Sequence, residues 1–324
     1  MKRRIALQTL AVMLAARALP TRAGQPTKIP IVGVPLIAAG PNDPIMVSLR
    51  RGLSERGYVD GQNIRVEHRF TEGRLEPLPG IVAELVEMKV DILVAGAEPI
   101  AKAAMEATRT IPIVVIGWDY DPVGSGLVRS LNKPGGNVTG VYLRVVETVG
   151  KRLELLREVL PGLSRVAVLY DSYGRRQLSN IEPAAAALGL RVFLIELREP
   201  YDFAAALKEA KAKKVGAVSV LFSPNFYVNR QRLTDAALAQ RLPTMFQEYY
   251  SVRDGGMISY GPSPTDGWFR AAYFIDRILK GAQPAELPIE RPDVYHLAVN
   301  MKTAKALGTT IPDSVLLRAD EVVR

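Results

Sequence analysis

The sequence predicts an α/β protein made of two doubly wound lobes, each built on a parallel sheet, and three observations support this prediction. Short apolar runs rich in Val and Ile alternate with amphipathic runs of helical period along most of the chain. The chain has 324 residues, too many for one ordinary core and enough for two α/β lobes. A turn cluster, Pro134-Gly135-Gly136-Asn137, divides the alternation into two series.

The first series begins with a clear strand and a clear helix. Ile29–Leu36 (IPIVGVPL) is continuously apolar, which is typical of a strand buried on both faces of its sheet. Pro44–Gly57 has apolar residues on one helical stripe, and Asp43 is placed to cap that helix. The other expected strands are 64–70, 91–95 and 111–116, and the other expected helices are 75–88 and 99–108.

The second series follows the turn cluster. A stripe of Val and Leu predicts a helix over 145–160, which stops at Pro161-Gly162. The other expected helices are 177–188, 203–213, 230–241, 267–280 and 302–307, and the expected strands are 165–170, 191–197, 217–222, 244–248, 257–260 and 295–299. Repeated βα units form parallel sheets, whose ligands bind at the carboxyl ends of the strands. In a two-lobed protein those ends face a cleft that hinge closure can bury.

The N-terminal segment has the three-part order of an export signal. Residues 1–4 are basic, Ile5–Ala16 is mostly apolar, and Thr21-Arg22-Ala23 offers a cleavage site of the small–x–small type. The apolar run of about 12 residues is too short to span a bilayer, which needs about 20. We therefore predict a signal peptide over residues 1–23, cleaved near Ala23, and a periplasmic mature protein. The alternative is an amphipathic N-terminal helix.

This signal accounts for much of the positive charge. The whole chain carries 42 basic and 33 acidic residues, a net charge of +9. Residues 1–23 contain five basic residues and no acid, so removing them leaves 37 basic and 33 acidic residues. A net charge of +4 is typical of a soluble surface, and no expected helix after residue 23 shows a dense basic stripe. We therefore expect no nucleic-acid partner.

The composition also argues against several kinds of chemistry. The chain contains no cysteine, so a disulfide, a thiolate metal site, a cysteine nucleophile and a lipid anchor at the cleavage point are all excluded. The two histidines, His68 and His296, have no acid or nucleophile partner by motif. There is no P-loop, nucleophile elbow or metal-spacing cluster. We therefore expect no enzyme activity, no catalytic residue, no cofactor and no bound metal.

Three segments resemble a known family. They are GLSERGYVDGQNIRVEHRF (Gly52–Phe70), DPVGSGLVRSLNKPGGNVTGV (Asp121–Val141) and VNMKTAKALGTTIPDSVLLRADEVV (Val299–Val323). Together they resemble the substrate-binding proteins of bacterial ABC transporters, in the subgroup linked to tryptophan or tyrosine uptake. The resemblance covers Pro30–Arg324 in the same order.

The resemblance implies the type I periplasmic-binding-protein fold, in which three crossovers form a hinge and no catalysis occurs. It places residues 28–140 and about 257–285 in lobe 1, and residues 141–256 and about 286–324 in lobe 2. It also implies a monomer that delivers its solute to an ABC permease in the inner membrane.

Three loops of lobe 1 are expected to contact the ligand. The small, apolar loop with Ala38 and Ala39 would let a ligand approach the backbone. In the loop with Ala97 and Glu98, a helix N-terminus favours an anionic group. The family usually has small or hydroxyl residues there, so Glu98 either faces the ligand or caps the helix. The third loop, with the candidates Asp119, Tyr120 and Asp121, suits an aromatic ligand bearing an amine, although Asp121 before proline is also ordinary turn chemistry.

Lobe 2 adds five candidate ligand-binding residues. They are Tyr142, Tyr173, Asn225, Glu248 and Tyr249. The family commonly has an acid–amide pair in the loop of Asn225, and here a proline precedes the amide. Packing at the lobe rim is the alternative role for Tyr173 and Tyr249.

Three functions follow as hypotheses. The first is the solute receptor of an ABC importer, which binds a small aromatic or amino-acid-like solute by hinge closure. The second is a periplasmic ligand sensor for a membrane signalling protein on the same fold. The third, a hydrolase or isomerase, lacks a catalytic motif.

Overall fold

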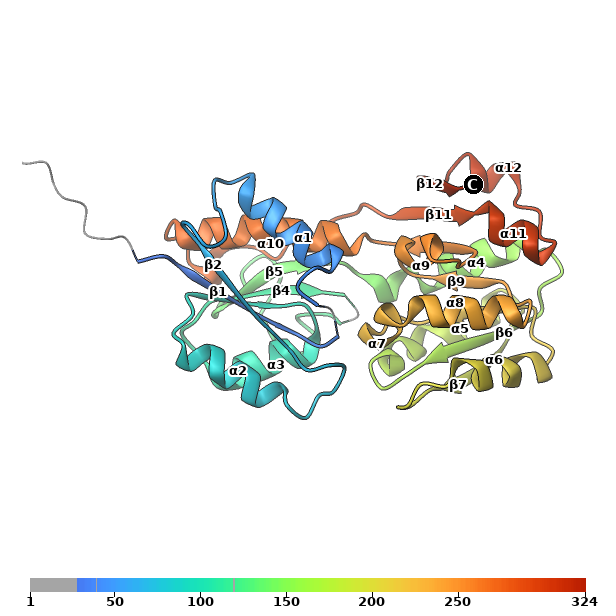
Figure 1. Cartoon of the computed structure of the whole chain (residues 1–324), viewed down its shortest axis with the longest axis horizontal. Coiled ribbons are helices and arrows are strands. Elements are labelled where there is room, and N and C mark those ends of the chain that lie inside the picture. The colour runs from blue at the N-terminus through green and yellow to red at the C-terminus, as the bar shows by residue number, and fades with distance from the viewer. Residues whose placement is uncertain (1–27, 39, 119) are drawn as a thin grey trace, which may run out of the picture.

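The computed structural model describes residues 28–324, apart from residues 39 and 119, and shows two α/β lobes side by side (Figure 1). The expected signal peptide, residues 1–23, lies outside the described residues. Among the helices that the structure describes, none is long and apolar enough to cross a membrane.

Lobe 1 contains a parallel five-stranded sheet in the order β2-β1-β3-β4-β5. Its strands are β1 (Ile31–Leu36), β2 (Arg65–Phe70), β3 (Ile92–Ala95), β4 (Ile113–Gly117) and β5 (Val138–Tyr142). β1 lies inside the sheet, with Val32 in register with Val66 on one side and Ile92 on the other. All five residues of β4 are buried, as the continuously apolar sequence of this strand predicts.

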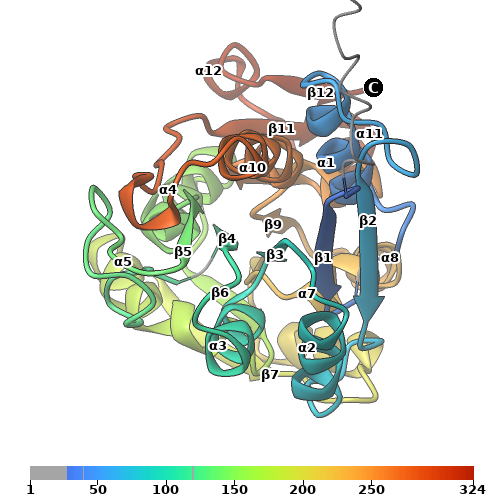
Figure 2. The ribbon, with the colours of Figure 1, turned by 90° about the vertical axis from the view of Figure 1, so that its left-hand side faces the viewer.

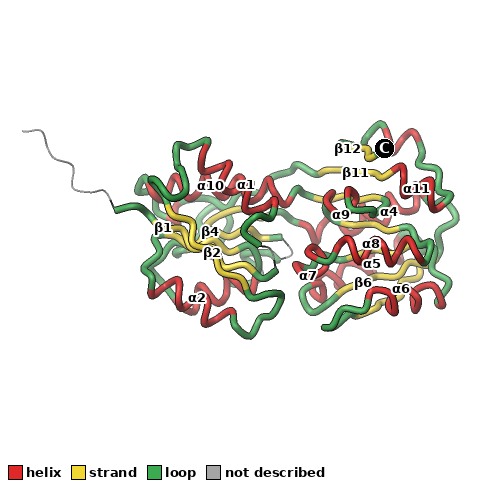
Figure 3. Tube along the Cα trace, viewed as in Figure 1, coloured by secondary structure: helices red, strands yellow, loops and turns green. Residues whose placement is uncertain are grey.

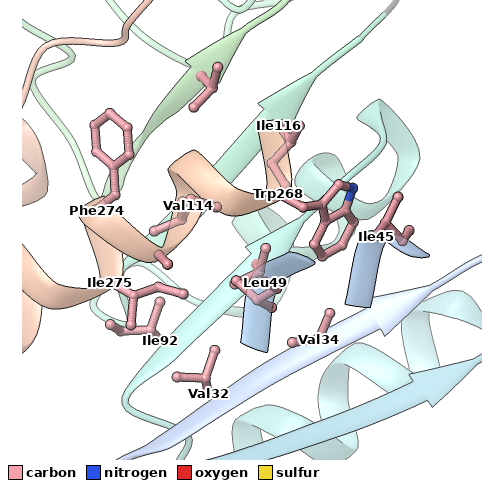
Figure 4. Close-up of a cluster of buried hydrophobic side chains, with 14 of the residues drawn as sticks. Val32, Val34, Ile45, Leu49, Ile92, Val114, Ile116, Trp268, Phe274 and Ile275 are labelled. Atoms are coloured by element: carbon pink, nitrogen blue, oxygen red, sulfur yellow. The ribbon is translucent and has the colours of Figure 1, made fainter. Parts of the chain in front are cut away.

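Helices cover both faces of this sheet (Figure 2). The helices of lobe 1 are α1 (Pro44–Ser54), α2 (Leu78–Glu87), α3 (Glu98–Ala107) and α10 (Pro264–Leu279). α1 and α10 pack on one face, and α2 and α3 pack on the other. Figure 4 shows the first of these cores, where Trp268 of α10 lies between Ile45 of α1 and Ile116 of β4.

Lobe 2 contains a seven-stranded sheet in the order β12-β11-β10-β9-β8-β6-β7. Its strands are β6 (Arg165–Tyr170), β7 (Arg191–Glu196), β8 (Ala217–Val220), β9 (Thr244–Phe246), β10 (Ile258–Gly261), β11 (His296–Asn300) and β12 (Glu321–Val323). Every neighbouring pair is parallel except β10 and β11.

Helices again cover both faces of the second sheet (Figure 3). They are α4 (Val149–Val159), α5 (Ile181–Ala187), α6 (Phe203–Ala212), α7 (Pro224–Val228), α8 (Arg230–Ala239), α9 (Tyr249–Arg253), α11 (Met301–Leu307) and α12 (Asp313–Leu316), with 3-10 turns η1 (Val145–Thr148), η2 (Gly174–Asn180) and η3 (Pro284–Glu286). The core beneath α4 and α5 also takes in α11 and α12, and the opposite core includes α6 and α8.

The chain passes between the two lobes three times, after β5, between β10 and α10, and before β11. The crossovers confirm the predicted architecture but lie at slightly different residues. β10 belongs to the second sheet, whereas the expected division placed residues from 257 in lobe 1. Leu287 and Ile289 pack into the cores of lobe 1, whereas the expected division placed residues from 286 in lobe 2. In both cases, sheet pairing or burial keeps the segment with its lobe.

Candidate ligand-binding cleft

A pocket lies between the two lobes, where strand ends of both sheets meet. Strands β1, β3, β4 and β8 end next to it, and the N-terminal residues of α1, α3, α7 and α10 face it. Its empty volume is about 530 Å³, including the part open to solvent, which is in the range of small-molecule sites. The lining residues are Leu36, Ile37, Ala38, Ile45, Gly96, Ala97, Ile100, Trp118, Phe222, Pro224, Tyr227, Pro264 and Trp268.

Aromatic rings from both lobes form the walls of this pocket. Trp118 of lobe 1 and Phe222 of lobe 2 stack across the cleft, with ring centroids 5.2 Å apart and planes 8° apart. Tyr227 of lobe 2 and Trp268 of lobe 1 complete the aromatic lining. Offset stacks of this geometry are favourable for flat aromatic groups, so the pocket is suited to a ring-bearing solute.

The indole of Trp268 packs directly against Gly96, the residue that follows β3. A Cβ atom at Gly96 would lie 2.5 Å from Cζ2 of Trp268, so the indole occupies space that only glycine leaves free. Trp268 is 3% exposed and Trp118 is also 3% exposed. These are the two tryptophans of the chain, and both line the pocket.

Two hydrogen bonds join the lobes beside the pocket. Tyr227 Oη donates to Asp43 Oδ1 at 3.2 Å, and Asn225 Nδ2 donates to the carbonyl of Gly73 at 3.4 Å. Asp43 also caps α1, since its Oδ1 accepts from the Ile45 amide at 3.0 Å. Burial raises the pKa of the Asp43 carboxyl above its ordinary value. The contacts show that the lobes meet across the cleft.

Buried Asp171 organises the lobe 2 wall. Its two oxygens accept hydrogen bonds from the amides of Tyr173 and Gly174 and from the hydroxyls of Tyr201 and Ser223. Ser223 in turn caps α7, because its Oγ accepts from the amides of the first residues of that helix. One carboxylate therefore fixes three loops at the carboxyl ends of the strands.

A second, polar pocket adjoins the first at α7. Pro224 lines the apolar pocket, and its neighbour Asn225 lines the polar one. The polar pocket also has residues from both lobes, with Arg74 and Glu76 on one side and Tyr173 and Tyr201 among those on the other. The cleft therefore has an apolar compartment and a charged one.

The first two predicted loops of lobe 1 reach the cleft. Ala38 and Ala97 line the apolar pocket, while Ala39 lies outside the described residues. Glu98 is buried at the start of α3, and its Oε1 lies 2.9 Å from Lys102 Nζ. Ala97 is the N-cap residue and makes no side-chain cap, and Glu98 in the first turn of α3 forms an ion pair with Lys102 one turn later.

The third predicted loop places its aromatic residue differently from expectation. Asp119 lies outside the described residues, and Trp118 lines the pocket instead of Tyr120, which packs in the core beneath α2 and α3. Asp121 is exposed outside the pocket lining, and its Oδ1 accepts from the Val123 amide at 2.9 Å. The turn before proline, which was the alternative for Asp121, accounts for this carboxylate.

The predicted tyrosines of lobe 2 and the hinge lie around the apolar pocket and not in its lining. Tyr142 is buried in the core of lobe 1, and burial is the main cause that raises its pKa to about 12. Tyr173 lines the polar pocket. Tyr249 Oη lies 3.2 Å from Thr265 Oγ1 at the crossover into α10. These positions suit packing at the rim and the hinge.

The remaining two candidates are buried in lobe 2. Asn225 lines the polar pocket and bridges the lobes. Glu248 is the N-cap of α9, where its carboxyl accepts from the amide and hydroxyl of Ser251. Burial raises the pKa of Glu248 to about 7. Glu248 is therefore a buried capping group outside the lining of the apolar pocket.

The four aromatic residues of the pocket lining were not among the candidates. Trp118 lies within a loop that was singled out, and Phe222 ends a run that was predicted as a strand. Tyr227 lies on α7, whose start, Ser-Pro, is a cap followed by proline and could have indicated a helix. Trp268 lies on α10, where the chain has crossed back into lobe 1, and no local sequence pattern indicates that crossover. Among the described residues, no group of three or more His, Cys, Asp and Glu could hold a metal ion.

Two lobes, three crossings and a shared pocket define a two-lobed solute-binding protein with the type I periplasmic-binding-protein fold. The chain belongs to the family of ABC transporter substrate-binding proteins, whose family model matches residues 32–323.

Individual relatives and solved structures are similar to this chain over most of its length. A tyrosine-binding protein from Clostridioides difficile is 28% identical over 280 residues, which cover 84% of this chain and 77% of the relative. A conserved domain protein from Vibrio cholerae has a TM-score of 0.83 at 28% identity, covering 91% of this chain and 100% of that one. An ABC domain in complex with L-Trp from Streptococcus pneumoniae has a TM-score of 0.80 at 28% identity, covering 91% and 99%.

Proposed function

We propose that this protein is the solute receptor of an ABC importer, which captures an aromatic amino acid between its lobes and delivers it to a permease without catalysis. The observation that carries the proposal is the apolar pocket, because aromatic rings from both lobes face each other across it. A ligand that contacts both walls stabilises the closed arrangement of the lobes.

The lining favours a flat ring with a polar end. The side chains around the ring site are almost entirely carbon, and separation of the stacked Trp118 and Phe222 would expose one planar face on each lobe. The N-terminus of the ten-residue helix α3 faces the same pocket and has no side-chain cap. Its amides and dipole favour an anionic group such as a carboxylate, and the buried Glu98 carboxyl in the first turn is itself paired with Lys102.

The named relatives support the same class of solute. One is described as tyrosine-binding and another was crystallised with L-Trp, each at 28% identity to this chain. The family itself is extracytoplasmic, and the basic–apolar–small order of residues 1–23 supports export by a cleaved signal peptide. Membership in the family of ABC transporter substrate-binding proteins supports delivery to a permease.

Intrinsic fluorescence gives a direct test, because both tryptophans line the pocket. Excitation at the red edge of the tryptophan band, during titration with L-tyrosine or L-phenylalanine, should give a saturable change in emission. L-Leucine and L-glutamate serve as controls for ring and charge. A flat titration with every aromatic amino acid, together with no retained solute in native mass spectrometry of the purified protein, would exclude this proposal.

A further inference from the structure

Arg152 is a cation sealed inside lobe 2. It is the largest of the fully buried side chains that the structure describes, with 0% exposure. It lies in the first half of α4, on the same buried face as Val149, Leu153 and Leu156. A helix position surrounded by apolar neighbours normally carries another apolar residue, so a guanidinium there needs a physical reason.

Only one of the three guanidinium nitrogens of Arg152 has a hydrogen-bond partner among the described residues. Nη1 donates to Thr148 Oγ1 and reaches the carbonyl of Val145 at 3.5 Å. Within the described residues, Nε and Nη2 are buried and have no hydrogen-bond partner. Both of these donors belong to the planar edge that commonly binds an anion with two parallel hydrogen bonds.

Among the residues that the structure describes, no acid compensates the charge. Burial lowers the pKa of Arg152 to about 9, and no carboxylate contributes to that shift. The group is therefore a cation at neutral pH. An unpaired ion in the interior destabilises the folded state, and water bound to its donors would not neutralise it. The dipole of α4 does not stabilise this positive charge, since the N-terminal half of a helix is the positive end of its dipole.

The site lies behind the pocket wall. α4 and η1 both pack against η2 and β10, so Gln177 of η2 is on the same side of the sheet. Gln177 Nε2 donates to the carbonyl of Phe222 at 3.1 Å, and Gln247 Nε2 donates to Gln177 Oε1 at 2.6 Å. These two amides connect the layer that holds Arg152 to the ring that stacks on Trp118.

We propose that Arg152 is the anchor of an anion site in lobe 2, which takes a small monoanionic group on its Nε and Nη2 edge. Two sources share this chemistry. One is a small inorganic anion that stays with the protein, and the other is the carboxylate of the captured solute. The first does not depend on the proposed function, and the second rests on it.

Bromide tests the inorganic source. Crystals of the solute-free protein grown in sodium bromide should show an anomalous peak next to the Arg152 guanidinium. In solution, the thermal midpoint should be about 2 °C higher in sodium chloride than in sodium gluconate at equal ionic strength. Arg152→Met, which replaces the cation with an uncharged unbranched chain, should abolish that difference. Arg157→Met, at an exposed position of the same helix, should retain it.

An amide analogue tests the second source. If the solute supplies the anion, Arg152→Met should weaken L-tyrosine binding at least tenfold and leave L-tyrosinamide binding unchanged, and no bromide peak should form. Density for water alone beside Arg152, with no halide dependence and equal losses for acid and amide, overturns the proposal. Failure of wild-type protein to bind any aromatic amino acid would count against the proposed function, while the bromide experiment would still decide the anion site.

Discussion

The two walls of the cleft differ in the chemistry of the residues that form and support them. The lobe 1 wall is almost wholly apolar, with Ile37, Ala97, Trp118 and Trp268 among its residues. The lobe 2 wall rests on buried polar groups, which include Asp171, Gln177, Ser223, Gln247 and Glu248. Lobe 1 therefore supplies shape and apolar surface, while lobe 2 holds its loops by hydrogen bonds.

This difference implies different kinds of sensitivity. A change in the lobe 2 scaffold leaves buried donors or acceptors unpaired, so it should alter stability first. A change in the lobe 1 wall removes or moves contact surface, so it should alter affinity first. The following predictions test this division, in order of decreasing expected change in the free energy of unfolding or of binding.

Asp171→Ala should have the largest effect. It removes the acceptor of four hydrogen bonds, two from backbone amides and two from hydroxyls. At about 1 kcal/mol net for each, the free energy of unfolding should fall by about 4 kcal/mol in a urea titration. Asp202→Ala, which removes the exposed cap of α6, is the control and should cost about 1 kcal/mol. Equal losses in the two variants would show that Asp171 does not hold the wall.

Glu248 should make lobe 2 sensitive to pH. Its pKa is raised from 4.5 to about 7, mainly by burial, so the native state binds more protons than the unfolded state between these values. The free energy of unfolding should therefore decrease by about 3 kcal/mol from pH 4.5 to pH 7 through this group. Glu248→Gln should remove that decrease.

The comparison is made by urea unfolding at several pH values across this window. As the pH rises, the free energy of unfolding of the variant should increase relative to that of the wild type, because only the wild type must ionise a buried carboxyl. Glu154→Gln, at an exposed position of α4, should follow the wild-type profile. Parallel profiles for wild type and Glu248→Gln would mean that Glu248 titrates like an exposed acid.

Trp118→Ala should separate affinity from stability. The substitution removes one face of the ring stack across the cleft. A buried aromatic contact of this kind is worth about 2 kcal/mol, so binding of an aromatic amino acid should weaken about 30-fold in calorimetric titration. Phe70→Ala, at an exposed end of β2, should bind as the wild type does. An unchanged affinity in Trp118→Ala would place the ring site elsewhere.

Gly96→Ala should have the smallest effect of the four. The new methyl group would lie 2.5 Å from Cζ2 of Trp268 and must displace the indole. We expect a loss of about 1 kcal/mol, or about fivefold in affinity, with a shifted tryptophan emission maximum. An emission spectrum and affinity identical to those of the wild type would show that the indole does not shape the pocket.

The sequence predicted the architecture well because most strands are runs of β-branched residues with helices between them. Two strands were not predicted, β12 (Glu321–Val323) and β5 (Val138–Tyr142). In β5, Gly140 interrupts the apolar run directly after a turn cluster. A Cβ at this position would lie 2.1 Å from the Val115 carbonyl, so the close pairing of β4 and β5 requires glycine. A residue that usually weakens a strand is here a condition for it.

The site was harder to predict than the fold. Ala38 and Ala97 reach the pocket because they follow strand ends, which is a local property of the chain. Tyr120 and Trp118 are two residues apart and equally aromatic, and only the path of the loop decides which one lines the pocket. Trp268 enters through a tertiary return of the chain that no local pattern encodes.

The stack of Trp118 on Phe222 has a consequence for selectivity. Because Trp118 and Phe222 stack on each other across the cleft, this contact competes with a solute for the same ring faces. An incoming solute gains affinity only by the amount that its contacts exceed those of the ring pair it separates. An aromatic solute exchanges one stack for two, whereas an aliphatic solute gives up a stack and receives none. Under the proposed function, we therefore expect the protein to select aromatic solutes through this exchange of ring contacts, before any polar group of the solute is recognised.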